Sequence, residues 1–324
     1  ELMEEFMLKS NFTFKGEEDL DIYVYKYEPK IKEKIKGIVQ ISHGMSEEAK
    51  RYEGFASFLN KNGYIVYIND HRGHGKSVKS INDIGKLADK DGLNCVVKDL
   101  YKLTNIIKKE NDNLPIFLFS HSMGSFAAQK YIMNYSREID GVILSGTNGL
   151  HGIEVDIGLI LSKILTSVKG RDNKAYLIDK LAFGRFNRNF KPNKTEFDWL
   201  SRDENEVDKY IDNKNCGVVF SNGYFYDLFR LFKEIKDINN IDKVDKNLPI
   251  YIFAGDKDPV GKFGKGIIKL YENYKKVGIK DIKFKLYSGG RHEMLNEINK
   301  EEVMHDTIKW LDYIVSKTMA SSKI

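Results

Sequence analysis

The chain has 324 residues, of which 41% are hydrophobic and 31% are charged. That composition is ordinary for a globular protein, and it excludes a disordered chain, a collagen and a long coiled coil. The 52 basic and 47 acidic residues leave a formal net charge of +5, and the lysines are interleaved with acids rather than with aromatic residues. We therefore expect no nucleic-acid partner.

Two cysteines, Cys95 and Cys216, are too few for a disulfide framework and too far apart for a paired-cysteine metal site. We expect both thiols to be reduced, as in a reducing compartment. Residues 1–5 lack the basic start and apolar run of a signal peptide, and the apolar stretch 157–161 is far too short to span a membrane. These features predict a cytoplasmic protein.

The first part of the chain alternates between short apolar runs and stretches with one apolar face. Alternating residues around a polar turn predict a β-hairpin over residues 11–27, and residues 93–109 place their apolar side chains on one side of a helix. The other predicted elements are strands at residues 37–42, 65–69, 115–119 and 141–145 and helices at residues 48–61 and 125–135. Strands that alternate with helices predict a mostly parallel central sheet that is flanked by helices on both faces.

Residues 150–245 interrupt this rhythm, because they contain helical and aromatic segments without strand–helix alternation. We interpret them as a mainly helical cap, inserted into a core that consists of residues 1–149 and 246–324. The alternation then resumes with predicted strands at residues 249–254 and 282–287 and helices at residues 264–276 and 301–317. An independent second domain is less favoured, since the pattern after the interruption continues the pattern before it.

Ser122 lies where a predicted apolar strand meets a helix, in the run Ser-His-Ser-Met-Gly that ends at Gly124. A tight turn of this kind lifts a serine hydroxyl above the sheet edge and points the helix N-terminus at developing negative charge. Ser120 stands where the motif prefers glycine, although serine is also small. The open alternative is a plain strand–turn–helix junction without chemistry.

A base and an acid follow later in the chain. His292 lies in a glycine-rich loop directly after the last predicted strand, where a base would sit at the carboxyl edge of the sheet, although it could be a surface-loop histidine. Asp256 and Asp258 both follow an earlier strand. Pro259 biases Asp258 towards an extended backbone, whereas Asp256 can cap the local turn, so Asp258 is favoured as the acid. The order Ser122, Asp258, His292 is that of α/β-hydrolases.

The stretch that ends the first core strand offers a way to stabilise negative charge. His43 and Gly44 stand there, and the glycine allows the backbone to approach a substrate oxygen, so both are candidate substrate-binding residues. The backbone N–H groups of Met45 and Met123 could together form an oxyanion hole. The alternative is an ordinary turn at a strand end.

The remaining histidines and the other glycine-rich loop are better explained without chemistry. His121 and His305 fit packing roles. Asp70, His71 and His74 lie close together but lack the helical spacing of a zinc site. The Gly-Lys-Ser triplet that follows them resembles a phosphate loop, but Asp70 stands where that motif requires its first glycine. We therefore expect neither a metal nor an organic cofactor.

Taken together, the motifs resemble those of the monoacylglycerol lipase and bacterial lysophospholipase branch of the α/β-hydrolases, also described as serine aminopeptidase-like. The resemblance extends from about residue 11 to residue 317. The stretches that carry it are HGMSEEAKRYEGFASFLNKNGYIVYINDHRGHGKS, FLFSHSMGS, GVILSGT, DWLSRDENEVDKYIDNKNC, GDKDPV and GGRHEMLNE.

This resemblance implies an α/β-hydrolase fold with a cap. It implies that Ser122 is the nucleophile, Asp258 the acid and His292 the base, and that Met45 and Met123 supply the oxyanion-hole amides. It also implies a structural role near the site for residues 70–75. The motif departs from the family at Ser120 and Ser125, which stand where glycine is usual.

We accordingly expect a serine carboxylic-ester hydrolase that works through an acyl-enzyme on monoacyl lipids, either monoacylglycerols or lysophospholipids. The alternatives are a small-ester esterase, a thioesterase or an aminopeptidase of the same fold, and a non-catalytic ligand-binding member.

The cap is expected to select the acyl ester. Ile157 and Leu161 belong to an apolar stripe at helical spacing, which could line a substrate pocket, touch a lipid surface or simply pack in the core. Tyr224 and Tyr226 are candidates to line the channel. A transient contact of the cap with a membrane surface is a further expectation, and the protein could be a monomer or a homodimer.

Overall fold

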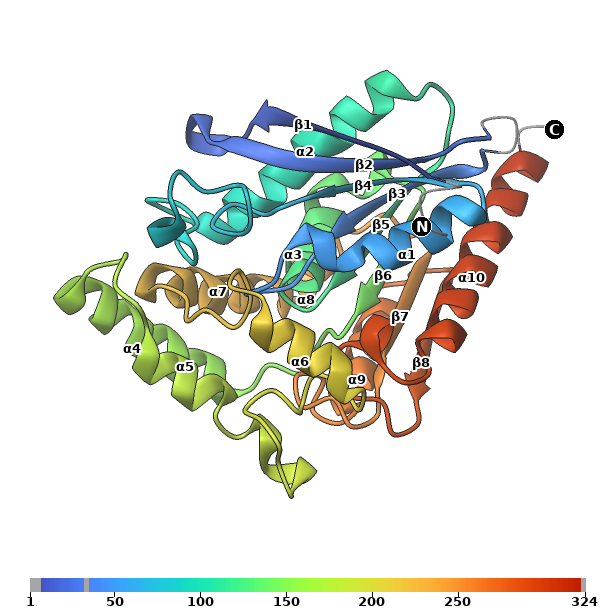
Figure 1. Ribbon diagram of the computed structural model, residues 1–324. Helices are drawn as coiled ribbons and strands as arrows, with labels where there is room; N and C mark the ends of the chain where they lie inside the picture. The colour runs from blue at the N-terminus through green and yellow to red at the C-terminus, as the bar shows by residue number, and fades with distance from the viewer. Residues whose placement is uncertain (1–6, 32–34, 322–324) are drawn as a thin grey trace.

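A single eight-stranded sheet runs through the molecule in the order β1-β2-β4-β3-β5-β6-β7-β8 (Figure 1). The computed structural model describes residues 7–31 and 35–321, with side chains up to residue 318. β1 pairs antiparallel with β2, β2 pairs antiparallel with β4, and all the other pairs are parallel. The strands are β1 Met7–Lys15, β2 Asp21–Pro29, β3 Gly37–Ser42, β4 Tyr64–Asn69, β5 Ile116–His121, β6 Gly141–Ser145, β7 Ile250–Gly255 and β8 Ile282–Tyr287.

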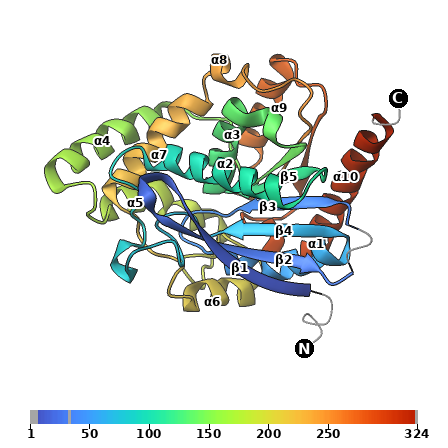
Figure 2. The same ribbon diagram turned by 90° about the horizontal axis from the view of Figure 1, so that it is seen from above.

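Helices cover both faces of this sheet (Figure 2). One apolar layer packs α1 and α10 against the sheet, and the other packs α2, α3, α7 and α9 against the opposite face. The helices of the core are α1 Glu53–Lys61, α2 Gly92–Glu110, α3 Met123–Tyr135, α9 Lys265–Lys276 and α10 Lys300–Ser321, and short 3-10 turns include η1 Glu17–Asp19, η3 Ala49–Tyr52, η4 Ile81–Asp83, η5 Ser136–Glu138 and η7 Met294–Asn296. The predicted α/β-hydrolase fold is therefore confirmed.

The five strands β3 to β7 are buried at every position. Their sequences are mainly apolar, with a few buried polar residues such as Gln40, because a parallel sheet that is covered on both faces has no solvent side. Gly141 shows how close the packing is, since a Cβ there would lie 2.8 Å from the ring of Trp310 in α10. β8 at the edge of the sheet is only partly buried and accordingly alternates between lysine and apolar residues.

The predicted elements of the core all exist, and the differences lie at their ends. The predicted hairpin 11–27 is longer at both ends, because β1 and β2 pair along their whole length. The predicted helix 48–61 begins as the 3-10 turn η3 before α1 starts, and the last helix runs on to Ser321. α3 begins two residues earlier than expected, directly after Ser122.

Between β6 and β7 the chain forms helices that lie along one side of the molecule (Figure 1). We call residues 150–245 the inserted segment. Its elements are α4 Ile153–Lys169, α5 Tyr176–Phe183, η6 Phe186–Phe190, α6 Glu204–Asp212, α7 Asn222–Ile235 and α8 Ile238–Ile241. α4 packs along α7, and a Cβ at Gly158 would lie only 2.4 Å from the Phe229 ring, so the two helices approach closely at that glycine. Among the described helices, none combines the length and the apolar character needed to cross a bilayer.

Candidate active site

Ser122 alone forms the turn between β5 and α3. Its backbone angles are φ +51° and ψ −121°, which non-glycine residues rarely adopt, and such a conformation costs on the order of 1–3 kcal/mol. The neighbouring strand holds it in place, because the Ser122 N–H donates to the Ser145 carbonyl at 3.0 Å. On the helix side, the Ser125 hydroxyl donates to the Ser122 carbonyl at 2.6 Å. The structure therefore keeps Ser122 strained at the carboxyl edge of the sheet.

Two small residues make this turn possible. A Cβ on Gly124 would lie 2.2 Å from the carbonyl oxygen of Ser42 and 2.5 Å from that of His43, so only glycine fits there. Ser120, which departs from the glycine of the motif, is fully buried, and its hydroxyl donates to the Ile143 carbonyl at 2.7 Å. The turn therefore accommodates the serine, because the neighbouring strand satisfies its polar group.

The structure brings Ser122, His292 and Asp258 into one hydrogen-bonded chain. The Nε2 atom of His292 lies 2.9 Å from the Ser122 hydroxyl oxygen, and its Nδ1 atom lies 3.0 Å from both carboxylate oxygens of Asp258. A proton on Nδ1 that is held by the carboxylate leaves the lone pair of Nε2 facing the serine hydroxyl. The imidazole is thus oriented to accept a proton from Ser122.

The surroundings of His292 favour its protonated form. Burial alone would lower the pKa of this imidazole, but the charge and hydrogen bond of Asp258 raise it, and the charges of Glu293 and Glu47 add to the increase. The net result is a pKa above the ordinary value of 6.5. An imidazolium formed during a reaction would therefore be stabilised.

The two candidate aspartates have separate roles in the structure. Asp258 is completely buried and, besides His292, accepts the N–H of Val260 at 2.9 Å. Asp256 instead accepts the N–H of Gly289 at 2.8 Å, in the loop that leads to His292. Asp256 therefore shapes the histidine loop, and Asp258 contacts the histidine itself.

The loop after β3 lies against Ser122. A Cβ on Gly44 would come within 3.2 Å of the Ser122 Cβ atom, so a side chain here would crowd the serine. In the described part of the chain, the N–H groups of Met45 and Met123 have no hydrogen-bond acceptor. Two backbone donors are therefore unpaired in the segments that meet at the serine.

His43, His71 and His74 form a buried cluster beneath this loop. Their ring centroids are between 4.3 and 6.3 Å apart, and every ring nitrogen has a hydrogen-bond contact within the described residues. His43 uses one ring nitrogen to reach the Gly44 carbonyl and the other to accept the His71 N–H. A substrate contact of His43 would therefore involve its main chain, and its imidazole serves to hold the loop.

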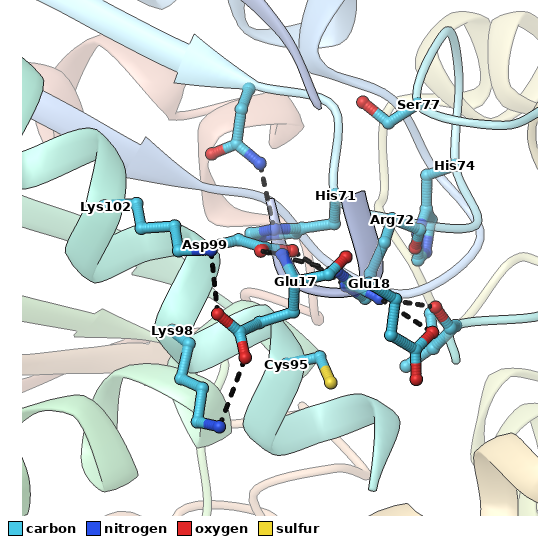
Figure 3. Close-up of polar contacts among 12 residues, drawn as sticks. Glu17, Glu18, His71, Arg72, His74, Ser77, Cys95, Lys98, Asp99 and Lys102 are labelled. Carbon is cyan, nitrogen blue, oxygen red and sulfur yellow. Dashed lines mark hydrogen bonds and ion pairs between the residues drawn. The ribbon is translucent and has the colours of Figure 1, made fainter. Parts of the chain in front are cut away.

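Residues 70–75 form the structural support that the resemblance implied. Arg72 is fully buried and pairs with Asp99 of α2 at 2.7 Å, and it also donates to the Glu17 carbonyl at 2.7 Å. Figure 3 shows Arg72 between α2 and the turn after β1, with Lys98 and Lys102 paired to the Glu17 carboxylate. No group of acids, histidines or cysteines in the described residues is arranged to hold a metal ion.

Trp199 of the inserted segment reaches the site, and the sequence did not single it out. Its ring lies 5.1 Å from the His292 ring, and it is nearly parallel to the Phe183 ring at 6.3 Å. Phe186 packs edge-on against it at 5.0 Å, and Phe225 lies 6.3 Å from Phe183. A row of packed aromatic rings therefore extends from the imidazole into the inserted segment. Trp199 stands in an irregular stretch without periodicity, and only its place within a family-like run of sequence could have drawn attention to it.

The four candidates in the inserted segment occupy different environments. Ile157 is 59% exposed on the outer face of α4, so the structure does not bring it to Ser122. Leu161 is partly buried and packs on the core. Tyr224 is fully buried among aromatic rings, and its hydroxyl has no partner among the described residues. Tyr226 is half-buried, with the Arg230 guanidinium 5.8 Å from its ring. Their contacts with substrate stay predictions.

Comparison with known proteins gives the family. The model of the family described as "Serine aminopeptidase, S33" matches residues 33–299. The chain belongs to this family. This chain is also 28% identical to the monoacylglycerol lipase of Mycolicibacterium smegmatis, over 85% of this chain and 88% of that protein. It is 23% identical to the monoglyceride lipase of Rattus norvegicus, over 87% and 84% of the two chains.

Solved structures agree with this assignment. A thermostable carboxyl esterase from Bacillus coagulans is 29% identical and superimposes with a TM-score of 0.87, over 96% of this chain and 99% of that chain. A soluble variant of monoglyceride lipase from Saccharomyces cerevisiae shares the fold, with 20% identity and a TM-score of 0.73 over 95% of each chain. The predicted family resemblance is therefore confirmed, and this serine aminopeptidase family member is a hydrolase.

Proposed function

We propose that the chain is a serine carboxylic-ester hydrolase that cleaves monoacyl lipids through an acyl-enzyme formed on Ser122. The observation that carries the proposal is the hydrogen-bonded chain from the strained Ser122 through His292 to the buried carboxylate of Asp258. A serine hydroxyl is a weak nucleophile, and a base that is itself oriented by an acid is the arrangement that activates it.

In the first half of the reaction, the Ser122 oxygen attacks the ester carbonyl while Nε2 of His292 takes the hydroxyl proton. Asp258 keeps the proton on Nδ1 and stabilises the imidazolium that forms. The tetrahedral intermediate then collapses, the bond to the leaving alcohol breaks, and His292 returns the proton to that alcohol. Ser122 is left acylated.

The negative charge on the carbonyl oxygen is assigned to the N–H groups of Met45 and Met123. Both lack another acceptor in the described residues, and Met123 is the first residue of α3, whose N-terminus favours negative charge. One such donor is typically worth about 10²–10³ in rate. A water molecule, activated by His292, then hydrolyses the acyl-enzyme in a second round. No step of this cycle requires a metal or an organic cofactor.

Two observations support an acyl chain as the group that binds. The row of aromatic rings of Phe183, Phe186, Trp199 and Phe225 begins at the proposed catalytic imidazole, and apolar side chains suit fatty acyl groups. Several relatives are named monoacylglycerol or monoglyceride lipase, and another is named a probable lysophospholipase. We assign the inserted segment, residues 150–245, the role of a cap over this site.

We further propose that the cap makes transient contact with a membrane surface. Large apolar side chains are exposed along the outer side of α4 and on α5, and Ile160 is 62% exposed. Residues 157–195 carry nine basic and only two acidic residues, although the whole chain is nearly balanced. The exposed apolar residues are Ile153, Ile157, Ile160, Ile164, Val168, Tyr176, Leu177 and Leu181. Apolar side chains beside basic ones suit an anionic lipid surface.

The first experiment is hydrolysis of p-nitrophenyl esters from short to long acyl chains, with Ser122→Ala and His292→Ala as controls. We expect the rate to increase with chain length and to vanish in both variants, after which monoacylglycerols and lysophospholipids would be compared directly. Wild-type protein that is no faster than Ser122→Ala on every ester would refute the ester-hydrolase proposal.

A second candidate is a small-ester hydrolase, and the close structural similarity to the Bacillus coagulans carboxyl esterase favours it. A maximum rate on the shortest esters would decide for this candidate.

Membrane contact is tested by flotation with vesicles. Vesicles that contain an anionic lipid should carry more protein than neutral vesicles, and Ile160→Ser with Ile164→Ser should abolish the difference. Equal recovery with both vesicle types would contradict the proposed electrostatic contribution.

We place the enzyme in the cytoplasm, as a monomer or a homodimer, where its two buried free cysteines would stay reduced.

A further inference from the structure

Arg51 is a largely buried arginine, with 11% of its side chain exposed, that joins two loops of the candidate site. Its Nη1 atom donates to Glu47 and to Glu293, at 2.7 Å each, and its Nη2 atom donates to the second carboxylate oxygen of Glu293 at 2.6 Å. The Arg51–Glu293 contact is therefore a two-bond pair, which restricts orientation as well as distance. All three side chains are nearly inaccessible to solvent.

Glu47 connects this network to the loop after β3. Its Oε1 atom accepts the Gly44 N–H at 2.5 Å and the Tyr52 hydroxyl at 2.8 Å. Gly44 lies against Ser122, and the next residue is Met45, whose amide we assign to the oxyanion hole. The carboxylate that holds Gly44 is therefore itself held by Arg51.

Glu293 connects the same network to the histidine loop, because it follows His292 directly in the chain. Its carboxylate also accepts the amide of Asn296 at 2.8 Å, and its N–H donates to the Leu200 carbonyl at 2.8 Å. Burial alone would raise the pKa of Glu293, but the charge and hydrogen bonds of Arg51 hold it well below its ordinary value. The pair is therefore ionised at neutral pH.

The ion network of Glu47, Arg51 and Glu293 lines a cavity and is not enclosed on all sides by protein. A cavity of about 690 Å³ opens between α1, α6 and α10, and its lining includes Glu47, Arg51, Glu293 and His121 but not Ser122. Apolar side chains of similar volume would often be as stable as such a buried ion network, so stability alone does not account for three charges at this position.

We propose that Arg51 is a positioning residue, which locks the loop of Gly44 and Met45 to the loop of His292 so that the oxyanion donor and the base stay aligned on Ser122. This inference rests on the proposed function and deepens it. Asp258 orients the His292 imidazole, and Arg51 holds the carboxylate of the next residue, Glu293. A misplacement of about 1 Å between such groups can lower a rate about 10²-fold.

The test is Glu293→Gln, which preserves the shape of the side chain and removes the negative charge that pairs with Arg51. We expect kcat to fall about 10- to 100-fold on a p-nitrophenyl ester, with KM within about twofold of wild type, because alignment matters in the transition state. The acid limb of the pH profile should also move to lower pH. Four charged or titratable groups influence the pKa of His292. The replacement removes the charge of Glu293 and leaves the other three, which are Asp258, Glu47 and His121.

The matched control is Asp227→Asn. Asp227 is also buried, and its carboxylate accepts both an arginine (Arg171, at 2.6 Å) and a backbone N–H (Gly92, at 2.7 Å). This replacement should lower the thermal midpoint and leave both kcat and the pH profile within about twofold of wild type. Glu293→Gln that is no slower than Asp227→Asn would overturn the proposal.

A second set of replacements separates positioning from simple charge balance. Arg51→Met combined with Glu47→Gln and Glu293→Gln leaves no unpaired buried charge, so the triple variant should unfold close to wild type. We expect its kcat to stay at least 10-fold low. Recovery of kcat together with stability would overturn the proposal.

The proposed function can fail separately from this inference. Labelling of the wild type by a fluorophosphonate, measured against Ser122→Ala, reports the reactive serine before any substrate is chosen. Wild type that is labelled no faster than Ser122→Ala refutes the serine hydrolase, and with it the positioning role. Wild type and Glu293→Gln that are labelled at the same high rate refute the positioning role alone.

Discussion

At the carboxyl edge of the sheet, hydrogen bonds fix the side chains of Asp258, His292 and the three clustered histidines, whereas the outer sides of α4 and α5 leave large apolar side chains in solvent. The edge holds Ser122 in a strained turn, three neutral histidines beneath it and a largely buried arginine beside it. The outer side of α4 carries Ile160, which is 62% exposed. The difference indicates fixed geometry in one region, and in the other it leaves the apolar surface on which the proposed membrane contact rests.

The largest effect is expected at the fixed edge, from Asp258→Asn. The asparagine would favour the wrong imidazole tautomer, so kcat should fall about 10⁴-fold, as is typical for such a replacement. In the wild type, kcat/KM should fall as the pH drops through the raised pKa of His292, since the base must be neutral. Any residual activity of Asp258→Asn should fall at a lower pH, because the charge that raises the pKa is gone. Unchanged kcat in steady-state assays would contradict the assignment.

The next effect concerns burial within the sheet. Ile143 of β6 is fully buried in the layer beneath α10, and Ile143→Ala should lower the free energy of unfolding by about 2–5 kcal/mol. Urea denaturation followed by circular dichroism measures this directly. A loss below about 1 kcal/mol would mean that the core around β6 is less tightly packed than the structure indicates.

Acid should lower the free energy of unfolding through the buried histidines at the carboxyl edge of the sheet. Burial lowers the pKa of His43 to about 4, and it lowers those of His71 and His74 well below 6.5. As the pH falls, the three histidines take up protons in the unfolded chain before they do so in the folded one. Their contribution to the free energy of unfolding is therefore complete above pH 6.5 and is lost as the pH falls towards their folded-state pKa values. His43 alone corresponds to about 3 kcal/mol. Asp70, whose pKa burial raises to about 6, offsets part of this loss.

Urea denaturation at several values between pH 7.5 and pH 5 tests the acid effect. The variant His43→Gln should show a shallower loss of stability over that range, by about one proton. Equal slopes for the variant and the wild type would exclude His43 as a source of the acid sensitivity.

The smallest effect is expected in the inserted segment. Ile160→Ala removes as much side chain as Ile143→Ala, but most of that side chain is already in water, so the free energy of unfolding should change by less than about 0.5 kcal/mol. The same denaturation experiment serves for both variants. A large loss at Ile160 would show that another copy of the chain covers α4 in solution.

The sequence predicts the structure best where one physical cause dominates a stretch of residues. Strands buried on both faces are mainly apolar, so β3, β5 and β7 were predictable to within a residue or two. The serine turn was recognisable because Gly124 is required by close contact with the β3 carbonyls. Asp258 was separable from Asp256 because Pro259 restricts the backbone before it.

The sequence did not reveal contacts between residues that are far apart in the chain. Arg51 and Glu293 are 242 residues apart in the chain, and Trp199 meets His292 from an irregular segment, so no local pattern marks either contact. The stripe on α4 posed a different problem. Helical spacing shows that a helix has an apolar face, but it does not show whether anything in the same chain covers that face.

The strained turn at Ser122 also has a consequence for how activity is acquired during folding. The turn is held by a carbonyl from β6, and it fits against carbonyls at the end of β3, so it cannot form from β5 and α3 alone. A refolding chain should therefore regain helical signal before it regains reactivity towards a serine-directed probe. Conversely, a chain that begins to open at β6 should lose its reactive serine while most of its secondary structure persists. A fall in enzymatic activity should therefore detect local unfolding of this protein before a loss of secondary structure does.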